Sequence, residues 1–186
     1  MEKTRIIFLR HADTQKDPSV NASLWGLSEE GEKQAEKVST LPIMNAVDVI
    51  YVSAEKKTTL TVKLLADRLG KEIYPLSLFD EVKRGDKFLT KEEFEAEKVK
   101  QLMDLEYHAF GGESGKEALA RFKASIAQIL KENKDKAILI VTHGTILNIY
   151  FADLLNVYKQ LPERWEKTVF CAHGIVENGI VIKDII

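Results

Sequence analysis

Short apolar runs alternate with amphipathic segments along this chain of 186 residues. Three of these runs are rich in β-branched residues and stop at polar ones: residues 6–9, 47–52 and 137–142. Runs of this kind are typical of strands that are buried on both faces of a parallel sheet. The segments between them have helical spacing, as expected for crossover helices. We therefore predict an α/β fold, a three-layer α/β/α sandwich with a mostly parallel central sheet.

Start and stop signals define the remaining elements. Ser28 is a helix N-cap, Gly70 closes a second helix, and two capping boxes begin two more (Thr90 with Glu93 and Ser114 with Glu117). The predicted helices cover about 28–40, 54–69, 91–105, 114–130 and 145–155. A short edge strand is expected at 73–78, and two further strands are expected between 168 and 186, around the turn at 177–179.

The segment from about 79 to 112 differs from the rest in composition and periodicity. It is rich in lysine and glutamate and only weakly periodic. We interpret it as a lid or insertion over one end of the sheet. No flexible linker or internal repeat divides the chain, so we expect a single domain over residues 1–186.

Composition excludes several classes of partner. The net charge of −2 provides no electrostatic basis for binding nucleic acid or an anionic membrane. No apolar run approaches the roughly 20 residues of a transmembrane helix, and no stretch of signal-peptide length follows residues 1–5. A single cysteine, Cys171, fits a reducing compartment, and its surroundings suggest a buried strand. We therefore expect a soluble, cytoplasmic protein.

Two of the predicted buried strands end in a histidine, His11 and His143. The carboxyl ends of such strands are where ligands bind in open α/β sheets. Arg10 precedes His11, and Lys57 lies three residues before Leu60 and seven before Leu64, on the side expected to face the core. A histidine after a strand can be incidental, and a lysine often extends to solvent. Together, however, these donors and charges suit a phosphoryl group.

No set of metal ligands is evident. The sequence has no cysteine pair, no His-x3-His and no close acidic cluster, so we expect neither a metal nor another cofactor.

The same residues carry a family resemblance. Residues 9–14 (L-R-H-A-D-T) resemble the R-H-G-E/D-[ST] signature of the histidine phosphatase superfamily, which includes the cofactor-dependent phosphoglycerate mutases. The match continues in register along nearly the whole chain. It includes L-S-E-E-G-E-K-Q-A at 27–35, S-A-E-K-K-T-T-L-T-V at 53–62, Glu81 with Gly85, G-G-E-S at 111–114 and V-T-H-G at 141–144. In this order and at these spacings the motifs are specific, and they imply a phosphoglycerate mutase-like fold.

The resemblance implies a role for each residue. His11 would be the nucleophile that becomes a phosphohistidine, and Glu81 would be the general acid and base, with Asp80 and Asp86 as the fallback acids. His143 would hold the phosphoryl group. The other expected phosphate-binding residues are Arg10, Thr14, Lys57 and Gly144.

The resemblance also leaves alternatives. The short insertion favours a phosphatase that hydrolyses a small phosphomonoester, although a phosphoprotein substrate or a mutase activity stays open. Lys57 replaces the usual arginine, so a group that donates bidentate hydrogen bonds becomes a single point charge. This substitution leaves room for a low-activity or non-catalytic phospho-ligand-binding protein. Lys83, Arg84 and Lys87 lie beside Glu81 and could meet a second anionic group on the substrate. Oligomeric state is left open.

Overall fold

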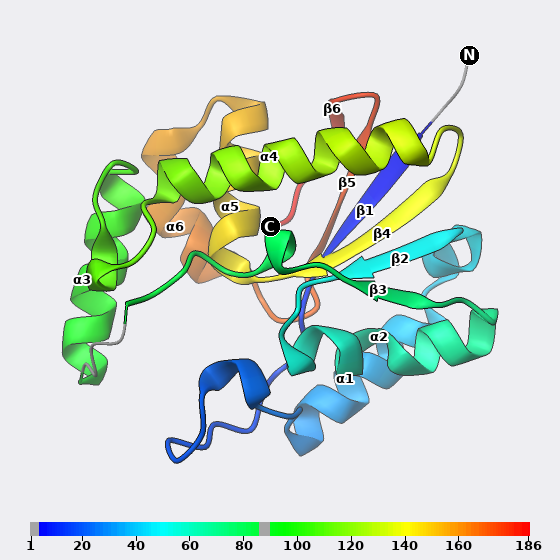
Figure 1. The fold of residues 1–186 in the computed structure, drawn as a ribbon, viewed down its shortest axis with the longest axis horizontal. Helices are drawn as coiled ribbons and strands as arrows, with labels where there is room; N and C mark the ends of the chain where they lie inside the picture. Colours follow the sequence, from blue (N-terminus) through cyan, green and yellow to red (C-terminus); the bar gives the residue numbers. More distant parts are fainter. Residues whose placement is uncertain (1–3, 86–89) are drawn as a thin grey trace.

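A six-stranded sheet forms the centre of the molecule in the computed structural model, which describes residues 4–85 and 90–186 (Figure 1). Its strands are β1 (Arg5–Arg10), β2 (Val49–Val52), β3 (Ile73–Pro75), β4 (Ala137–Thr142), β5 (His173–Glu177) and β6 (Ile180–Lys183). Their spatial order is β3-β2-β4-β1-β5-β6. The first four strands in this order pair in parallel, whereas β5 and β6 are antiparallel to their neighbours. The sheet is therefore mostly parallel, as predicted.

Helices cover both faces of the sheet (Figure 1). On one face lie α1 (Glu29–Thr40) and α2 (Lys56–Leu69). On the other face lie α4 (Gly115–Glu132) and α5 (Gly144–Leu155), with α6 (Leu161–Lys167) packed beside α5. The helix of the 79–112 segment, α3 (Lys91–Met103), lies at the carboxyl edge of the parallel strands. Short 3-10 helices occupy 22–24, 42–46, 77–79, 109–111 and 158–160.

Side-chain alternation along β1 explains the three layers. Ile6 and Phe8 pack into the core beneath α4 and α5, whereas Ile7 and Leu9 pack into the core beneath α1 and α2. All four side chains are almost completely buried. A strand that is apolar on both faces can only be satisfied between two layers of helices. The predicted α/β/α sandwich is thus the observed architecture.

The predictions for individual elements and residues need three corrections. Helix α6 was not predicted, although Pro162 near its start is a common helix-initiation signal. Cys171 does not lie in a buried strand: it sits in a turn with a left-handed φ of 57°, two residues before β5 begins at His173. Leu64 does not face the core: its side chain is 50% exposed, and Val62 and Leu65 line the buried face of α2 instead.

Within the part of the chain that the structure describes, no helix is long and apolar enough to cross a membrane. Asp86 and Lys87, to which the sequence assigned a fallback acid and a cation, lie outside the described residues.

Candidate active site

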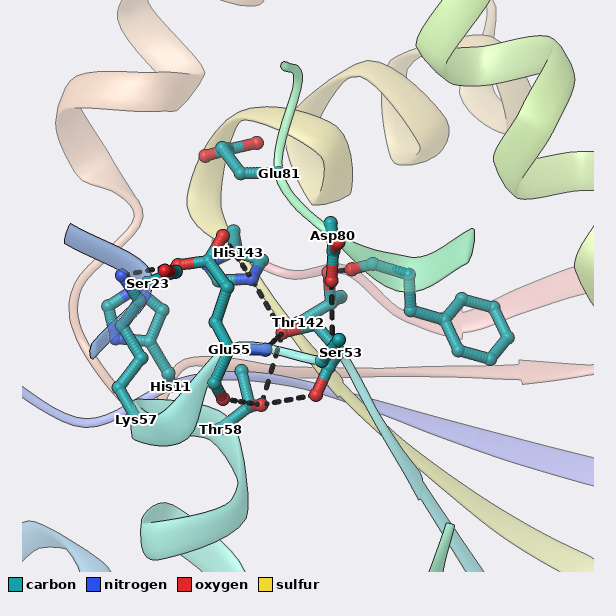
Figure 2. A network of polar contacts seen from close by, with 12 residues as sticks. His11, Ser23, Ser53, Glu55, Lys57, Thr58, Asp80, Glu81, Thr142 and His143 are labelled. Atoms are coloured by element: carbon teal, nitrogen blue, oxygen red, sulfur yellow. Dashed lines mark hydrogen bonds and ion pairs between the residues drawn. The ribbon is translucent and has the colours of Figure 1, made fainter. Parts of the chain in front are cut away.

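The site forms at the carboxyl edge of three neighbouring parallel strands. Thr142 of β4 pairs with Arg10 of β1, and Val141 pairs with Val52 of β2, so these strands end at the same level. The next residue after each strand is His11, Ser53 or His143. Strand register alone therefore brings together three polar side chains from distant parts of the sequence (Figure 2).

His11 is held in one orientation by its own loop. Its Nδ1 lies 2.7 Å from the carbonyl oxygen of Ala12, so the proton is on Nδ1 and the lone pair of Nε2 is available for chemistry. The ring is 9% exposed, and its centroid lies 5.1 Å from that of His143. Burial is the main reason that the pKa of His11 falls to about 3, and the neighbouring His143, Lys57 and Arg10 lower it further. The imidazole is neutral near pH 7, as a nucleophile must be.

His143 is the N-cap residue of α5 and is almost completely buried. Its Nε2 lies 2.8 Å from the hydroxyl of Ser53, which joins the ends of β2 and β4. Burial lowers the pKa of His143 to about 3, with Glu81 opposing the shift and Lys57 adding to it. The second imidazole is therefore also neutral and is oriented by a hydrogen bond.

Arg10 packs against Gly144 and Phe170. A Cβ atom at Gly144 would lie 3.1 Å from Nε of Arg10, so a larger residue would push the guanidinium aside. One terminal nitrogen donates to the carbonyl oxygen of Thr168, and the guanidinium carbon lies 4.2 Å from the centre of the Phe170 ring. That ring also lies 5.6 Å from the ring of His11. Phe170 thus covers both groups.

Lys57 faces the site, as predicted, and is 6% exposed. Its ammonium donates to the carbonyl oxygen of Ala22 at 2.9 Å and lies 2.5 Å from a carboxylate oxygen of Glu55. The other oxygen of Glu55 lies 3.4 Å from Nε2 of His143. The carboxylate of Glu55 therefore bridges two groups expected to hold a phosphoryl group (Figure 2). The sequence analysis missed Glu55, because its role depends on His143 lying nearby.

Glu81 reaches the same region from the other side of His143 (Figure 2). Its two carboxylate oxygens accept hydrogen bonds from the backbone N–H groups of Thr145 and Ile146, at 3.0 and 2.9 Å, at the start of α5. Burial raises the pKa of Glu81, but the charge of Lys98, the neighbouring imidazole of His143 and the hydrogen bonds from Thr145 outweigh this effect and lower it to about 2. The carboxylate is ionised and fixed at the positive end of a helix.

Arg121 of α4 holds the backbone that carries Glu81. Its guanidinium donates to the carbonyl oxygens of Leu78, Asp80 and Glu81, at 2.7, 3.2 and 3.3 Å. It also forms two hydrogen bonds with the carboxylate of Glu113, at 2.9 and 2.7 Å. Glu113 belongs to the G-G-E-S motif, so this motif supports the segment that carries the acid.

The remaining predicted residues lie around the loop after β1. Thr14 forms an isolated β-bridge with Leu27, and within residues 4–85 and 90–186 its side chain forms no hydrogen bond that would define a role. Ala12 has a negative φ and donates its N–H to the hydroxyl of Thr61 at 2.9 Å, so its methyl group causes no backbone strain. Gly31 lies where a Cβ atom would be only 2.0 Å from the carbonyl oxygen of Asp13, which explains the glycine of the second motif.

Among the described residues, no group of three or more His, Cys, Asp or Glu side chains is arranged to hold a metal ion. The site instead consists of two neutral imidazoles, three cationic side chains (Arg10, Lys57 and Lys98) and two carboxylates (Glu55 and Glu81). The sheet order and this arrangement define an α/β protein with a polar site centred on two histidines.

The family model for the histidine phosphatase superfamily (branch 1) matches residues 6–178. The chain belongs to this family. No curated protein sequence matches the chain.

Solved structures share the fold at low sequence identity. A mycobacterial glucosyl-3-phosphoglycerate phosphatase is 19% identical, with a TM-score of 0.78 and coverage of 98% of both chains. A mutant phosphoserine phosphatase from Entamoeba histolytica in complex with phosphoserine is 20% identical, with a TM-score of 0.78 and coverage of 97% of this chain and 94% of the other. A putative alpha-ribazole-5'-P phosphatase from Escherichia coli is 17% identical, with a TM-score of 0.73 and the same coverage.

Proposed function

We propose that this protein is a phosphomonoester hydrolase that works through a phosphohistidine on His11. The main support is the state of His11: Nδ1 is fixed on a backbone carbonyl, and the ring is neutral beside two cations. A neutral imidazole of this kind can attack phosphorus, and the cations can stabilise the charge of the transferring group.

The reaction has two steps. In the first, the lone pair of Nε2 of His11 attacks phosphorus, the ester P–O bond breaks, and the leaving oxygen takes a proton from Glu81. In the second, water attacks phosphorus, Glu81 takes a proton from it, and the P–N bond breaks to release phosphate and restore His11. Arg10, Lys57 and His143 hold the phosphoryl oxygens, with Thr14 and Gly144 as further contacts.

Glu81 must be protonated for the first step, although its pKa is low in the ligand-free site. A bound phosphate places negative charge beside this carboxylate and so raises its pKa. A substrate that arrives as the monoanion also brings the missing proton, since the second pKa of a phosphate ester is about 6. We therefore expect the reaction to be favoured on the acidic side of neutrality.

A small phosphomonoester with a second anionic group is the substrate class that we favour. Arg84 supports this choice, because its exposed guanidinium adds positive charge near the site and is the last of several contributions that act on the pKa of His143. Its guanidinium lies 4.5 Å from the ring centre of Phe94, and among the described residues it forms no ion pair. Two structural neighbours are named for glucosyl-3-phosphoglycerate and phosphoserine, and both compounds carry a carboxylate besides the phosphate.

A non-catalytic phospho-ligand-binding protein is the second candidate. The observation that favours it is the pairing of Lys57 with Glu55, which weakens the cationic site just where the family pattern has arginine. A binding protein of this kind would retain inorganic phosphate without turning over any ester.

Phosphate release from p-nitrophenyl phosphate in the presence of EDTA tests the proposal, followed by a panel of phosphorylated metabolites and phosphoproteins. We expect hydrolysis by the wild type, and at least about a 1,000-fold loss for His11→Ala, because the covalent route is removed. Inactivity of the wild type across the panel, with phosphate binding retained, would support the binding protein. Interconversion of phosphoglycerates that depends on a bisphosphate primer would identify a mutase.

A further inference from the structure

A buried lysine of α3 approaches the same residue that holds Glu81. Lys98 is 2% exposed, and its ammonium lies 3.1 Å from the hydroxyl oxygen of Thr145 and 3.0 Å from the side-chain oxygen of Gln101. Burying an ammonium among neutral partners alone is costly. The position of Lys98 therefore requires a nearby negative charge.

Thr145 connects Lys98 to that charge. Its backbone N–H donates to one oxygen of Glu81 at 3.0 Å, and its hydroxyl accepts from Lys98. A hydroxyl that accepts from an ammonium has its own proton left to donate, and a hydrogen bond from the Thr145 side chain contributes to lowering the pKa of Glu81. The three groups form a chain in which Thr145 binds Lys98 through its hydroxyl and Glu81 through its backbone N–H.

Among the described residues, charged groups of both signs act on this chain. Glu81 attracts the ammonium of Lys98, whereas Arg84 repels it. The aromatic rings of Phe94 and Phe110 lie 5.9 and 5.4 Å from the ammonium and separate it from water. His143 and Arg10 are two further described groups that interact with Glu81. Burial lowers the pKa of Lys98 to about 8, with Glu81 opposing this shift, so the lysine stays charged at neutral pH.

We propose that Lys98 is a positioning residue for the acid-base chemistry: through the hydroxyl of Thr145, its ammonium keeps the Glu81 carboxylate ionised at the start of α5. The inference rests on the proposed function, in which Glu81 accepts the proton of the water that attacks phosphohistidine. It also links the 79–112 segment to chemistry, because Glu81 keeps this state only while α3 is docked.

The test is the pH dependence of kcat for p-nitrophenyl phosphate. This substrate has a good leaving group, so the step in which Glu81 acts as a base governs turnover. The phosphoryl group on His11 raises the pKa of Glu81 into the measurable range. For Lys98→Met we expect the acidic limb of the kcat profile to move to higher pH by about 1 unit, since the loss of a nearby opposite charge shifts the pKa of a carboxylate by that order. Lys98→Arg should restore the wild-type limb.

Lys100→Met is the matched control, because Lys100 is an exposed residue of the same helix that pairs with Glu97. We expect its profile to equal that of the wild type. Thr145→Val tests the same chain independently and should shift the limb in the same direction, whereas Thr145→Ser should not. If Lys98→Met does not fold, as judged by circular dichroism, the comparison of Thr145→Val with Thr145→Ser tests the inference instead.

The inference and the proposed function fail differently. An active, His11-dependent wild type whose acidic limb is unmoved by Lys98→Met and Thr145→Val would overturn the inference and leave the hydrolase intact. A wild type without activity, or with activity that survives His11→Ala, would overturn the proposed function itself.

Discussion

The carboxylate of Glu55 occupies a position between two groups that we expect to hold phosphate. It lies 2.5 Å from the ammonium of Lys57 and 3.4 Å from Nε2 of His143. In the proposed reaction, an incoming phosphoryl group would need the same two partners and would therefore have to displace Glu55 first. If the protein works as proposed, displacement would cost part of its affinity for phosphate, because a lysine offers the phosphate only a point charge in exchange for the carboxylate.

Glu55→Gln should therefore bind phosphate more tightly. A neutral amide leaves Lys57 and His143 available and removes like-charge repulsion of the ligand, so we expect the inhibition constant of inorganic phosphate to fall about tenfold, or roughly 1.4 kcal/mol. Inhibition of p-nitrophenyl phosphate hydrolysis by inorganic phosphate measures this constant. Glu132→Gln, an exposed substitution at the end of α4, should leave the constant unchanged. Weaker binding by Glu55→Gln would show that Glu55 assists the ligand instead of competing with it.

At the scale of elements, α4 determines where the proposed acid lies. Arg121 donates hydrogen bonds to three backbone carbonyl oxygens, those of Leu78, Asp80 and Glu81, and it pairs with the carboxylate of Glu113. Both members of this ion pair are about 12 to 13% exposed, so the pair is largely desolvated. Removing one member would leave the other as an uncompensated charge.

Arg121→Met should lower both stability and activity. We expect a loss of about 3 kcal/mol in the free energy of unfolding, because Glu113 stays buried without its partner. The carboxylate of Glu81 should also lose its fixed position, with kcat falling at least about tenfold. Urea denaturation and steady-state kinetics measure the two effects. Adding Glu113→Gln should recover part of the stability but not the activity. Full recovery of kcat in the double variant would argue against the positioning role of Arg121.

At the scale of the whole molecule, the site makes stability depend on pH. His11 and His143 have pKa values of about 3 in the folded protein and near 6.5 when unfolded, so the unfolded chain binds more protons between these limits. Stability is therefore lost as the pH falls from 6.5 toward 3. Glu81, with a folded pKa of about 2 against an ordinary 4.5, adds a loss in the same direction below about pH 4.5.

The free energy of unfolding should fall by up to about 2.7 kcal/mol for each pH unit below 6, since two histidines each contribute about 1.4 kcal/mol per unit. Urea denaturation at pH 7, 6 and 5 measures this slope. His143→Gln removes one of the two titrating groups, so its slope between pH 6 and 5 should be about half that of the wild type. Equal slopes for the two proteins would show that His143 is not held neutral by the fold.

Much of the fold follows from local patterns in the sequence. Apolar runs, N-caps such as Ser28 and capping boxes such as that of Ser114 act over a few residues, and the structure contains the corresponding strands and helices. The two histidines were also predictable, because a residue that follows a buried parallel strand must lie at the carboxyl edge. Cys171 was wrongly assigned to a strand, because its apolar neighbours indicate burial but not the left-handed turn that precedes β5.

The tertiary structure decided which charges meet. Nothing near Lys98 in the sequence indicates Thr145, which lies 47 positions away, and Ser53 meets His143 across 90 positions. Glu55 is close to Lys57 in sequence, yet its bridging position depends on β2 and β4 being neighbours. Periodicity and capping are local, whereas the pKa of a buried group depends on every charge that packing brings near it. The sequence by itself therefore determined the sheet and the histidines at its edge, and only packing determined how that edge is charged and oriented.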